Sequence, residues 1–186
     1  MKVNGNGQAK VLNSEELKSL FERGFVNARD KALFGICLFS GCRISEALAL
    51  KTTDIKCQTI TFRKATTKGR LRTRIVNIQP GLAKILAEYT PRKNPHNALF
   101  PGKRGVSECL TRYTADKILR AACKRIGVEG VSTHSFRRSA LTQMCNANIP
   151  LRHIQEISGH NDLGVLQKYL EVTDEERKKA SSVIGF

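Results

Sequence analysis

Residues 58–78, QTITFRKATTKGRLRTRIVNI, decide the fold class of this chain. Apolar and polar residues alternate over 58–64 and again over 72–78, which is the pattern of strands with one buried face. The basic stretch between them contains Gly69 and is typical of a turn. The sequence therefore predicts a β-hairpin. Its tip and strands are rich in cations, among them Lys64, Lys68, Arg70, Arg72 and Arg74.

Helical patterns occupy most of the remaining chain. A capping-box pattern at Asn13 and Glu16 begins a helix that Gly24 ends. Residues 91–105 are rich in proline, glycine and charge, and we expect a loop there. The sequence predicts a mainly α domain with one small antiparallel β-sheet, of the α+β class. Further helices are expected over 28–40, 43–50, 81–89, 107–126, 133–146, 151–158, 163–170 and 174–183.

The charge of the chain favours a polyanionic partner. Its 186 residues include 32 Lys and Arg against 16 Asp and Glu, which gives a formal net charge of +16. Nucleic acid is the leading candidate for such a partner. No apolar run approaches the roughly 18 residues of a membrane-spanning helix, and the N-terminus lacks the apolar core of a signal peptide. We therefore expect a cytoplasmic, DNA-associated protein with no membrane partner.

The six cysteines show no CxxC pair and no zinc-ligand spacing with a histidine. We expect them to be reduced and mostly buried. The sequence also lacks an EF-hand loop, a P-loop and clustered aspartates, so no metal or nucleotide cofactor is expected. Any phosphate chemistry must then use basic side chains. The cysteines are Cys37, Cys42, Cys57, Cys109, Cys123 and Cys145.

Two pairs of polar residues are candidates for binding a phosphate. In STHSFRRSALT (132–142), His134 and Arg137 lie one turn apart at a predicted helix start, where the helix terminus also favours an anion. In RISEALAL (43–50), Arg43 and Glu46 are likewise one turn apart. Each pair has an ordinary alternative, because surface His–Arg pairs and Arg–Glu ion pairs are common on helices.

Three further candidates have equally ordinary alternatives. Lys68 is a lysine in a turn, and most such lysines are solvated. His160 follows Ser158-Gly159 between two predicted helices, where a cap or a buried hydrogen bond would explain it. Tyr169 fits the apolar face of an amphipathic helix. None of the three identifies a site by itself.

The order of these segments is more informative than any one of them. SGCRISEALALKTTDI (40–55), TTKGRLRTRIVNI (66–78), HSFRRSALT (134–142) and SGHNDLGVLQKYLEV (158–172) follow one another along the chain. Together they resemble the catalytic domain of tyrosine recombinases, the phage integrase and Xer family. The resemblance extends from about residue 11 to about residue 180. It implies metal-independent cleavage and rejoining of DNA through a 3′-phosphotyrosyl intermediate.

The resemblance also implies a role for each candidate residue. Arginine forks bind two phosphate oxygens, and a tyrosine with a pKa of about 10 needs a positive field to act as nucleophile. Glu46 would support the first arginine, and DNA contacts are expected from Lys64, Arg70, Arg72, Arg74 and Arg138. The implied catalytic set is Arg43 and Arg137 as phosphate clamp, His134 and His160 as hydrogen-bond donors, Lys68 as general acid and Tyr169 as nucleophile.

The same resemblance sets expectations about domains and partners. We expect a disordered segment at 1–10 and a catalytic domain over 11–186, without the N-terminal core-binding domain of the family. The full-length enzyme is expected to form a homotetramer on double-stranded DNA, and the isolated domain to be monomeric. Other readings remain open: a type IB topoisomerase, a non-catalytic DNA-binding regulator on the same fold, or a basic structural protein. The latter two have no need of Tyr169 or Lys68.

Overall fold

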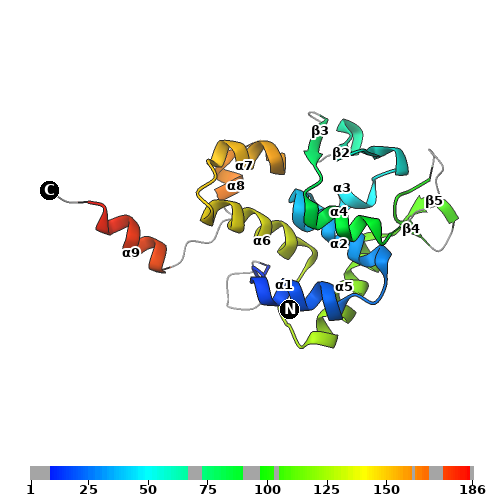
Figure 1. Cartoon of the computed structure of the whole chain (residues 1–186), viewed down its shortest axis with the longest axis horizontal. Helices are drawn as coiled ribbons and strands as arrows, with labels where there is room; N and C mark the ends of the chain where they lie inside the picture. The colour runs from blue at the N-terminus through cyan, green and yellow to red at the C-terminus, as the bar shows by residue number, and fades with distance from the viewer. Residues whose placement is uncertain are drawn as a thin grey trace.

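The computed structural model describes residues 9–66, 73–89, 97–102, 105–160, 162–167 and 174–184. Packed helices form the body of the molecule, and two small sheets lie at its periphery (Figure 1). This arrangement confirms the predicted α+β class. The α-helices are α1 (Ser14–Ser19), α2 (Ala28–Ser40), α3 (Ile44–Leu48), α4 (Pro80–Ala87), α5 (Arg112–Ile126), α6 (Thr133–Asn146), α7 (Leu151–Ser158), α8 (Leu163–Gln167) and α9 (Asp174–Ser182).

Side-chain caps begin the helices where the sequence predicted them. Asn13 Oδ1 accepts the amide of Glu16 at 2.8 Å, and the Glu16 carboxylate accepts the amide of Asn13 at 3.2 Å. The chain continues from α1 into a π-helical turn, η1 (Leu20–Gly24). Ser132 caps α6 by accepting the amide of His134 at 3.2 Å. The predicted bounds of α2, α6 and α7 are confirmed.

Two glycines turn the chain sharply at the ends of α2 and α7. Gly41 has a φ of +59° and Gly159 a φ of +68°. This left-handed backbone is readily adopted by glycine because no Cβ collides with the following carbonyl. The turns place Arg43 two residues after Gly41 and His160 directly after Gly159. Both glycines therefore position candidate site residues.

The predicted hairpin is confirmed by β2 (Thr59–Phe62) and β3 (Arg74–Asn77). These strands pair antiparallel, with Phe62 opposite Arg74. A two-residue strand, β1 (Ile55–Lys56), pairs with the other edge of β2 and was not predicted. Short 3-10 turns, η2 (Thr52–Asp54) and η3 (Lys64–Thr66), flank the first two strands. The connection over 67–72 lies outside the described residues.

The prediction of a loop over 91–105 followed by a helix from 107 is wrong in two respects. Strands β4 (Pro101–Gly102) and β5 (Gly105–Cys109) form a second antiparallel pair. The amide of Leu110 donates to the Phe100 carbonyl at 2.8 Å, which extends this pairing beyond β5. Thr111 then caps α5 by accepting the amide of Thr114 at 3.1 Å. Backbone pairing and this cap together move the helix start to Arg112.

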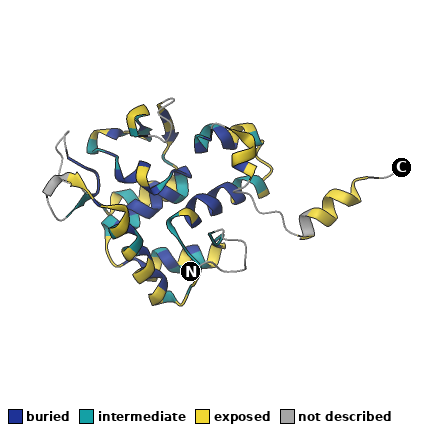
Figure 2. Cartoon of the chain, turned by 180° about the vertical axis from the view of Figure 1, so that it is seen from behind, coloured by how far each residue is buried: buried dark blue, intermediate teal, exposed yellow. Residues whose placement is uncertain are grey.

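Stacked phenylalanines form the centre of the core. The ring of Phe34 lies 4.9 Å from that of Phe25 and 5.0 Å from that of Phe136, measured between centroids. All three are buried, and burial of a side chain of this size stabilises a fold by about 1.5–3 kcal/mol. Phe34 lies on α2 and Phe136 on α6, and Phe25 directly follows η1. Figure 2 shows much of the ribbon in the body of the molecule in dark blue, the colour of buried residues. Phe136 precedes Arg137, so this packing also fixes the helix from which Arg137 extends.

The C-terminal helix α9 lies apart from the packed helices in both views (Figures 1 and 2). Its described side chains are exposed, and beyond it Val183 and Ile184 are 80% and 85% exposed. Arg177 pairs with Asp174 one turn away on the same helix.

Across the described part of the chain, no helix is long and apolar enough to cross a membrane.

The cysteines are all free, as predicted, but only half of them are buried. Cys37, Cys42 and Cys123 lie in the core, and Cys145 is partly covered. Cys57 is exposed in the turn between β1 and β2, and Cys109 is exposed at the end of β5. The expectation of mostly buried cysteines is therefore wrong for these two, because both sit on small peripheral sheets rather than on core helices.

At the other end of the chain, Ala9 and Lys10 are held against the helical body. The amide of Lys10 donates to the Gly130 carbonyl at 3.3 Å, and the Arg138 guanidinium donates to the carbonyl of Ala9. Residues 1–8, the rest of the segment expected to be disordered, lie outside the described residues.

Candidate active site

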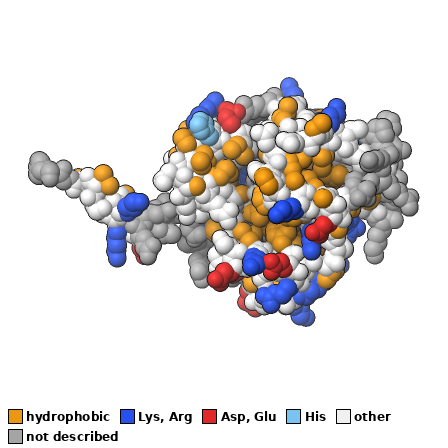
Figure 3. All heavy atoms as spheres, in the orientation of Figure 1, with side chains coloured by type: hydrophobic (Ala, Val, Ile, Leu, Met, Phe, Trp, Pro, Cys, Tyr) orange, Lys and Arg blue, Asp and Glu red, His pale blue; other side chains and the backbone are white. Residues whose placement is uncertain are grey.

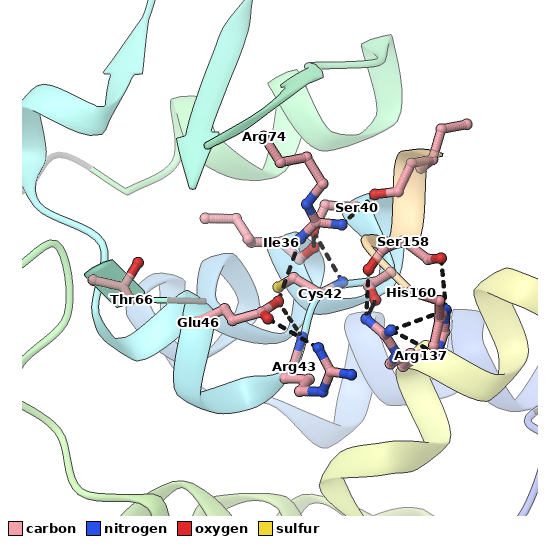
Figure 4. A network of polar contacts seen from close by, with 12 residues as sticks. Ile36, Ser40, Cys42, Arg43, Glu46, Thr66, Arg74, Arg137, Ser158 and His160 are labelled. Carbon is pink, nitrogen blue, oxygen red and sulfur yellow. Dashed lines mark hydrogen bonds and ion pairs between the residues drawn. The ribbon is translucent and has the colours of Figure 1, made fainter. Parts of the chain in front are cut away.

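Arg43, Arg137 and His160 are far apart in sequence but lie together at the turns formed by Gly41 and Gly159. Arg137 extends from α6 toward both turns (Figure 4). Its Nη1 donates to the Gly41 carbonyl at 2.6 Å and to the Ser158 carbonyl at 2.9 Å. Its Nη2 lies 2.8 Å from Nε2 of His160 and 3.1 Å from Nδ1. One guanidinium thus joins the end of α2 to the end of α7.

Arg137 is only 1% exposed. A guanidinium keeps its charge even when buried, since its pKa lies above about 12. The partners just named are two carbonyls and an imidazole, which contact its two terminal nitrogens and carry no negative charge. The site therefore holds a buried positive charge whose field acts on whatever binds beside it.

His160 is a neutral side chain in this cluster. Its pKa falls to about 3, first because burial disfavours the charged ring and then because Arg137, Arg43 and Arg74 are positive. Arginine only donates hydrogen bonds, so the short contact assigns Nε2 of His160 as an acceptor. Nδ1 then carries the proton and donates to the Ser158 hydroxyl at 2.7 Å. Ser158 in turn donates to the Gln155 carbonyl at 3.3 Å.

Arg43 and Glu46 form a compact unit at the start of α3. The Glu46 carboxylate accepts the backbone amide and Nη1 of Arg43, both at 3.1 Å. Glu46 is 3% exposed, whereas the Arg43 side chain is 18% exposed. The carboxylate therefore caps the helix and holds the arginine side chain in one orientation. The supporting role predicted for Glu46 agrees with these contacts.

Arg74 is part of this cluster rather than of the surface. It is 7% exposed, and its Nη2 lies 3.3 Å from Glu46 Oε2. Its Nη1 donates to the Ile157 carbonyl in α7, and its guanidinium carbon lies 4.5 Å from the centroid of the buried Phe62 ring. The DNA contact predicted for Arg74 does not fit this burial. In β3, Arg74 and Val76 face inward and Ile75 faces outward.

His134 lies on the first turn of α6, one turn before Arg137. Its side chain is exposed. Its pKa is lowered, first by partial loss of hydration and then by the positive charges of Arg112, Arg137 and Arg43. His134 is therefore neutral near pH 7. Arg112, the first residue of α5, was not predicted as a site residue. Its sequence signal is weak, since it is one basic residue among many.

The remaining predicted residues divide into three groups. Lys64 is exposed in η3, as a DNA contact requires. Arg138 is 7% exposed and bound to the Ala9 carbonyl, so its predicted contact with DNA does not fit its position. The third group, Lys68, Arg70, Arg72 and Tyr169, lies outside the described residues.

Within the described ranges, no group of three or more His, Cys, Asp or Glu is placed to hold a metal ion.

On one face of the molecule, the surface charges do not mark a binding site. On the face shown in Figure 3, separate Lys and Arg side chains lie around and between hydrophobic ones and do not gather into a single patch. The cluster around Arg137 is recognised instead by burial and by convergent hydrogen bonds, which are frequent features of functional sites.

Comparison with known proteins places the chain in a family. The sequence model described as the phage integrase family matches residues 10–176. This chain belongs to that family. Its curated relatives include putative integrase/recombinase y4eF of Sinorhizobium fredii, which is 32% identical to this chain over 168 residues. Tyrosine recombinase XerC of Roseiflexus is 32% identical over 153 residues.

The alignments cover most of this chain but only part of each relative. They include 87% of this chain and 64% of y4eF, and 77% of this chain and 48% of the Roseiflexus protein. The chain thus spans about half to two thirds of the length of these curated relatives.

Solved structures show the same fold. The XerH site-specific recombinase in a post-cleavage complex with palindromic difH substrate matches 98% of this chain and 55% of that chain. The TM-score is 0.77 at 26% identity. The catalytic domain of bacteriophage HP1 integrase covers 87% of each chain with a TM-score of 0.61 at 21% identity. The HP1 likeness concerns the fold alone.

Proposed function

We propose that this chain is the catalytic domain of a site-specific DNA recombinase that cleaves and rejoins DNA strands through Tyr169. The observation that carries the proposal is the convergence of Arg43, Arg137 and His160 at the two glycine turns. Relatives named as recombinases and integrases support it, and so does the XerH structure, whose title describes a complex with a difH substrate.

The charges of the cluster suit a phosphodiester. Arg43, Arg74 and Arg137 bring three positive charges, Glu46 brings one negative charge, and His160 is neutral. The excess of positive charge complements a phosphate, and more strongly the pentacoordinate phosphorane into which it passes. Donors arranged before the reaction stabilise such a transition state without reorganisation. Arg43, whose side chain is 18% exposed, would hold one oxygen of that phosphate. Arg137 is 1% exposed, so in this proposal it reaches a second oxygen only when the contact between its Nη2 and His160 opens as DNA binds.

Each step of the proposed reaction conserves atoms and charge. The hydroxyl of Tyr169 first loses its proton to solvent, favoured by the positive charges of the cluster, and the phenolate oxygen attacks phosphorus. A P–O bond to Tyr169 forms, and the bond from phosphorus to the 5′-oxygen breaks. Lys68 gives its proton to the departing 5′-oxygen. His134, neutral near pH 7 and exposed beside the cluster, donates a hydrogen bond to a phosphate oxygen. The 3′-phosphotyrosyl bond retains the energy of the original linkage, so attack by a 5′-hydroxyl reseals the strand.

The partner in this proposal is double-stranded DNA. Lys64 and Arg112 are exposed, and Arg112 lies close enough to His134 to lower its pKa. Both residues would contact phosphates next to the reacting one. Such contacts make binding steeply dependent on salt. The proposal extends to a homotetramer on DNA for the full-length enzyme, and to a monomer for this domain alone.

A trapping experiment tests the function. The protein is incubated at low salt, without metal, with a pool of nicked duplexes whose central sequence is randomised. Cleavage releases a short strand beyond the nick, so the covalent product cannot be resealed and survives denaturation. Recovered DNA is then sequenced to identify the preferred site.

Two variants that each lose one hydroxyl provide the comparison. Tyr169→Phe should give no covalent product, whereas Tyr113→Phe, at an exposed position of α5, should behave as the wild type. DNA affinity should be the same in all three proteins. If the wild type binds DNA but forms no covalent product, the proposed function is wrong and a non-catalytic DNA-binding role replaces it.

A further inference from the structure

Arg74 occupies the base of the hairpin, at the point where the two strands separate. It is the first residue of β3 and pairs with Phe62, the last residue of β2. The chain between these strands contains Lys68, the general acid of the proposed function. The guanidinium of Arg74 lies over the Phe62 ring, which fixes its position by a buried cation–π contact. Any movement of Arg74 is therefore transmitted to both strands.

From this base, Arg74 reaches the unit that contains Arg43. Its Nη2 lies 3.3 Å from Oε2 of Glu46, the same oxygen that accepts the amide of Arg43. The other carboxylate oxygen accepts Nη1 of Arg43. Glu46 is thus held between two arginines, and its orientation depends on both. Figure 4 shows Arg74 and Arg43 on opposite sides of this carboxylate.

Arg74 also contacts the turn that carries His160. Its Nη1 donates to the Ile157 carbonyl at the end of α7. Its side chain passes beside Gly159, since a Cβ built on that glycine would lie 3.5 Å from Cδ and Nε of Arg74. The next residue, His160, is the acceptor for Arg137. One side chain therefore connects β3, α3 and the end of α7.

We propose that Arg74 is a positioning residue that ties the base of the Lys68 hairpin to the helix carrying Arg43 and to the turn carrying His160. This inference rests on the proposed function, in which all three groups act on one phosphate. The planar fork of arginine is needed because it donates in two directions, to Glu46 and to Ile157, while stacking on Phe62. Lysine would retain the charge but not the two-way connection.

The test compares Arg74→Lys with Arg63→Gln. Arg63 follows Phe62 at the same hairpin base, but its Nη2 binds Asp54 at 3.0 Å and the Ala49 carbonyl at 2.9 Å, outside the cluster. Each protein is first checked for folding by circular dichroism. Cleavage is then measured on the duplex recovered by trapping, at saturating protein, and DNA affinity is measured separately across a salt series.

Arg74→Lys should slow cleavage by about 100-fold, the scale expected when reacting groups are misplaced by an ångström. Because Arg74 is buried, DNA affinity and its salt dependence should not change. Arg63→Gln should cleave at the wild-type rate. Equal cleavage by Arg74→Lys and the wild type would overturn the proposal, because a residue that contributes only charge is replaceable by lysine. A weakened affinity with a lower salt slope would overturn it in favour of a direct DNA contact.

A substrate with a 5′-thiol leaving group tests the link to the hairpin. A thiolate departs without a proton, so the contribution of Lys68 no longer matters. On this substrate, Arg74→Lys should recover the part of its cleavage rate that is lost through Lys68. The part of the rate that is lost through Arg43 and His160 should not recover. Full recovery would contradict the connection to Arg43 and His160, and no recovery would contradict the connection to the hairpin.

Hydrogen exchange separates a failure of this inference from a failure of the proposed function. The amide of Arg43 donates to Glu46 and the amide of Gly159 donates to the Gln155 carbonyl at 2.9 Å. Both amides should exchange faster in Arg74→Lys and at the wild-type rate in Arg63→Gln, whether or not the wild type cleaves DNA. Unchanged exchange at both amides in Arg74→Lys would contradict the positioning role.

Discussion

The cluster around Arg137 and the helix α9 differ in the surroundings of their charged side chains, which are buried in the cluster and exposed in α9. In the cluster, Glu46 and Arg74 are 3% and 7% exposed, and each side chain bonds to groups from other elements. In α9, the Arg177–Asp174 pair is 68% and 83% exposed and lies within one helix. The first pair is fixed by its surroundings, whereas the second is one of the exposed pairs that contribute little to stability.

This difference bears on the function of each region. A site that stabilises a transition state must hold its donors in place before the substrate arrives, which the buried cluster does. Helix α9, which is directly followed by the exposed Val183 and Ile184, has no comparable constraint. Substitutions in the cluster should therefore have large effects, and substitutions in α9 should have small ones.

The largest effect is expected from loss of the phosphate clamp. Arg137→Ala should lower the rate of covalent complex formation by about 100- to 1000-fold or more, as removal of transition-state donors does elsewhere. Arg137→Lys should restore little, because lysine lacks the fork that binds both carbonyls and His160. Arg125→Gln, whose arginine binds the Gly24 carbonyl away from the site, is the control. Near-normal cleavage by Arg137→Ala would remove Arg137 from the mechanism.

A second prediction concerns stability. Glu46→Ala leaves two arginines facing each other without their shared carboxylate, so the free energy of unfolding should fall by about 3–5 kcal/mol. Asp174→Ala breaks only the exposed pair of α9 and should leave the unfolding midpoint in urea unchanged. Equal midpoints for both variants would contradict the contrast between the two regions.

The pH dependence of stability follows from His160. Its pKa is about 3 in the folded protein against 6.5 ordinarily, so between these values the unfolded chain binds the proton more readily. The stability that this neutral histidine contributes is present above pH 6.5 and is lost as the pH falls toward 3. His160→Gln should therefore flatten the decline in stability between pH 6.5 and 5, before most carboxylates titrate. His153→Gln, on the exposed side of α7, is the control, and an identical slope in both variants would count against a buried neutral His160.

The smallest effect is expected in the C-terminal segment. The double variant Val183→Ser and Ile184→Ser removes exposed apolar groups, so its thermal unfolding should match that of the wild type. Light scattering should show a monomer for both proteins in the absence of DNA. A defined oligomer of the wild type that dissociates in this variant would contradict this expectation and assign a partner surface to the residues that follow α9.

Much of the fold could be predicted from local sequence signals. Asn13, Ser132 and the hairpin alternation are short-range features, and the elements they predict are confirmed. Strand β5 could not be predicted in this way, because its pairing with Pro101 and Gly102 is a tertiary contact and residues 107–111 have no strong strand pattern. The helix pattern of α5 was therefore extended too far toward the N-terminus.

Some members of the predicted site are brought together by the structure, whereas Lys68 and Tyr169 lie outside the described residues. Arg43, Glu46, Arg137 and His160 were expected to act together, and the structure brings them together. Val76 follows Arg74 by two residues, and residues two apart share a strand face, so this spacing indicates that Arg74 faces the same side as an apolar residue. Basic composition around the hairpin favoured a DNA contact instead. The contacts of Arg74 with Glu46 and Ile157 depend on the packing of β3 against α3 and α7, which sequence spacing does not encode.

The most direct test of the central claim is to locate the covalent bond between protein and DNA. Wild-type covalent complexes formed with a chelator present are digested with nuclease and protease, and the peptide that retains a nucleotide is identified by mass spectrometry. The account predicts a 3′-nucleotide linked to Tyr169, with none on Tyr89 or Tyr113. A nucleotide on another residue, or DNA binding without any covalent product, would contradict it.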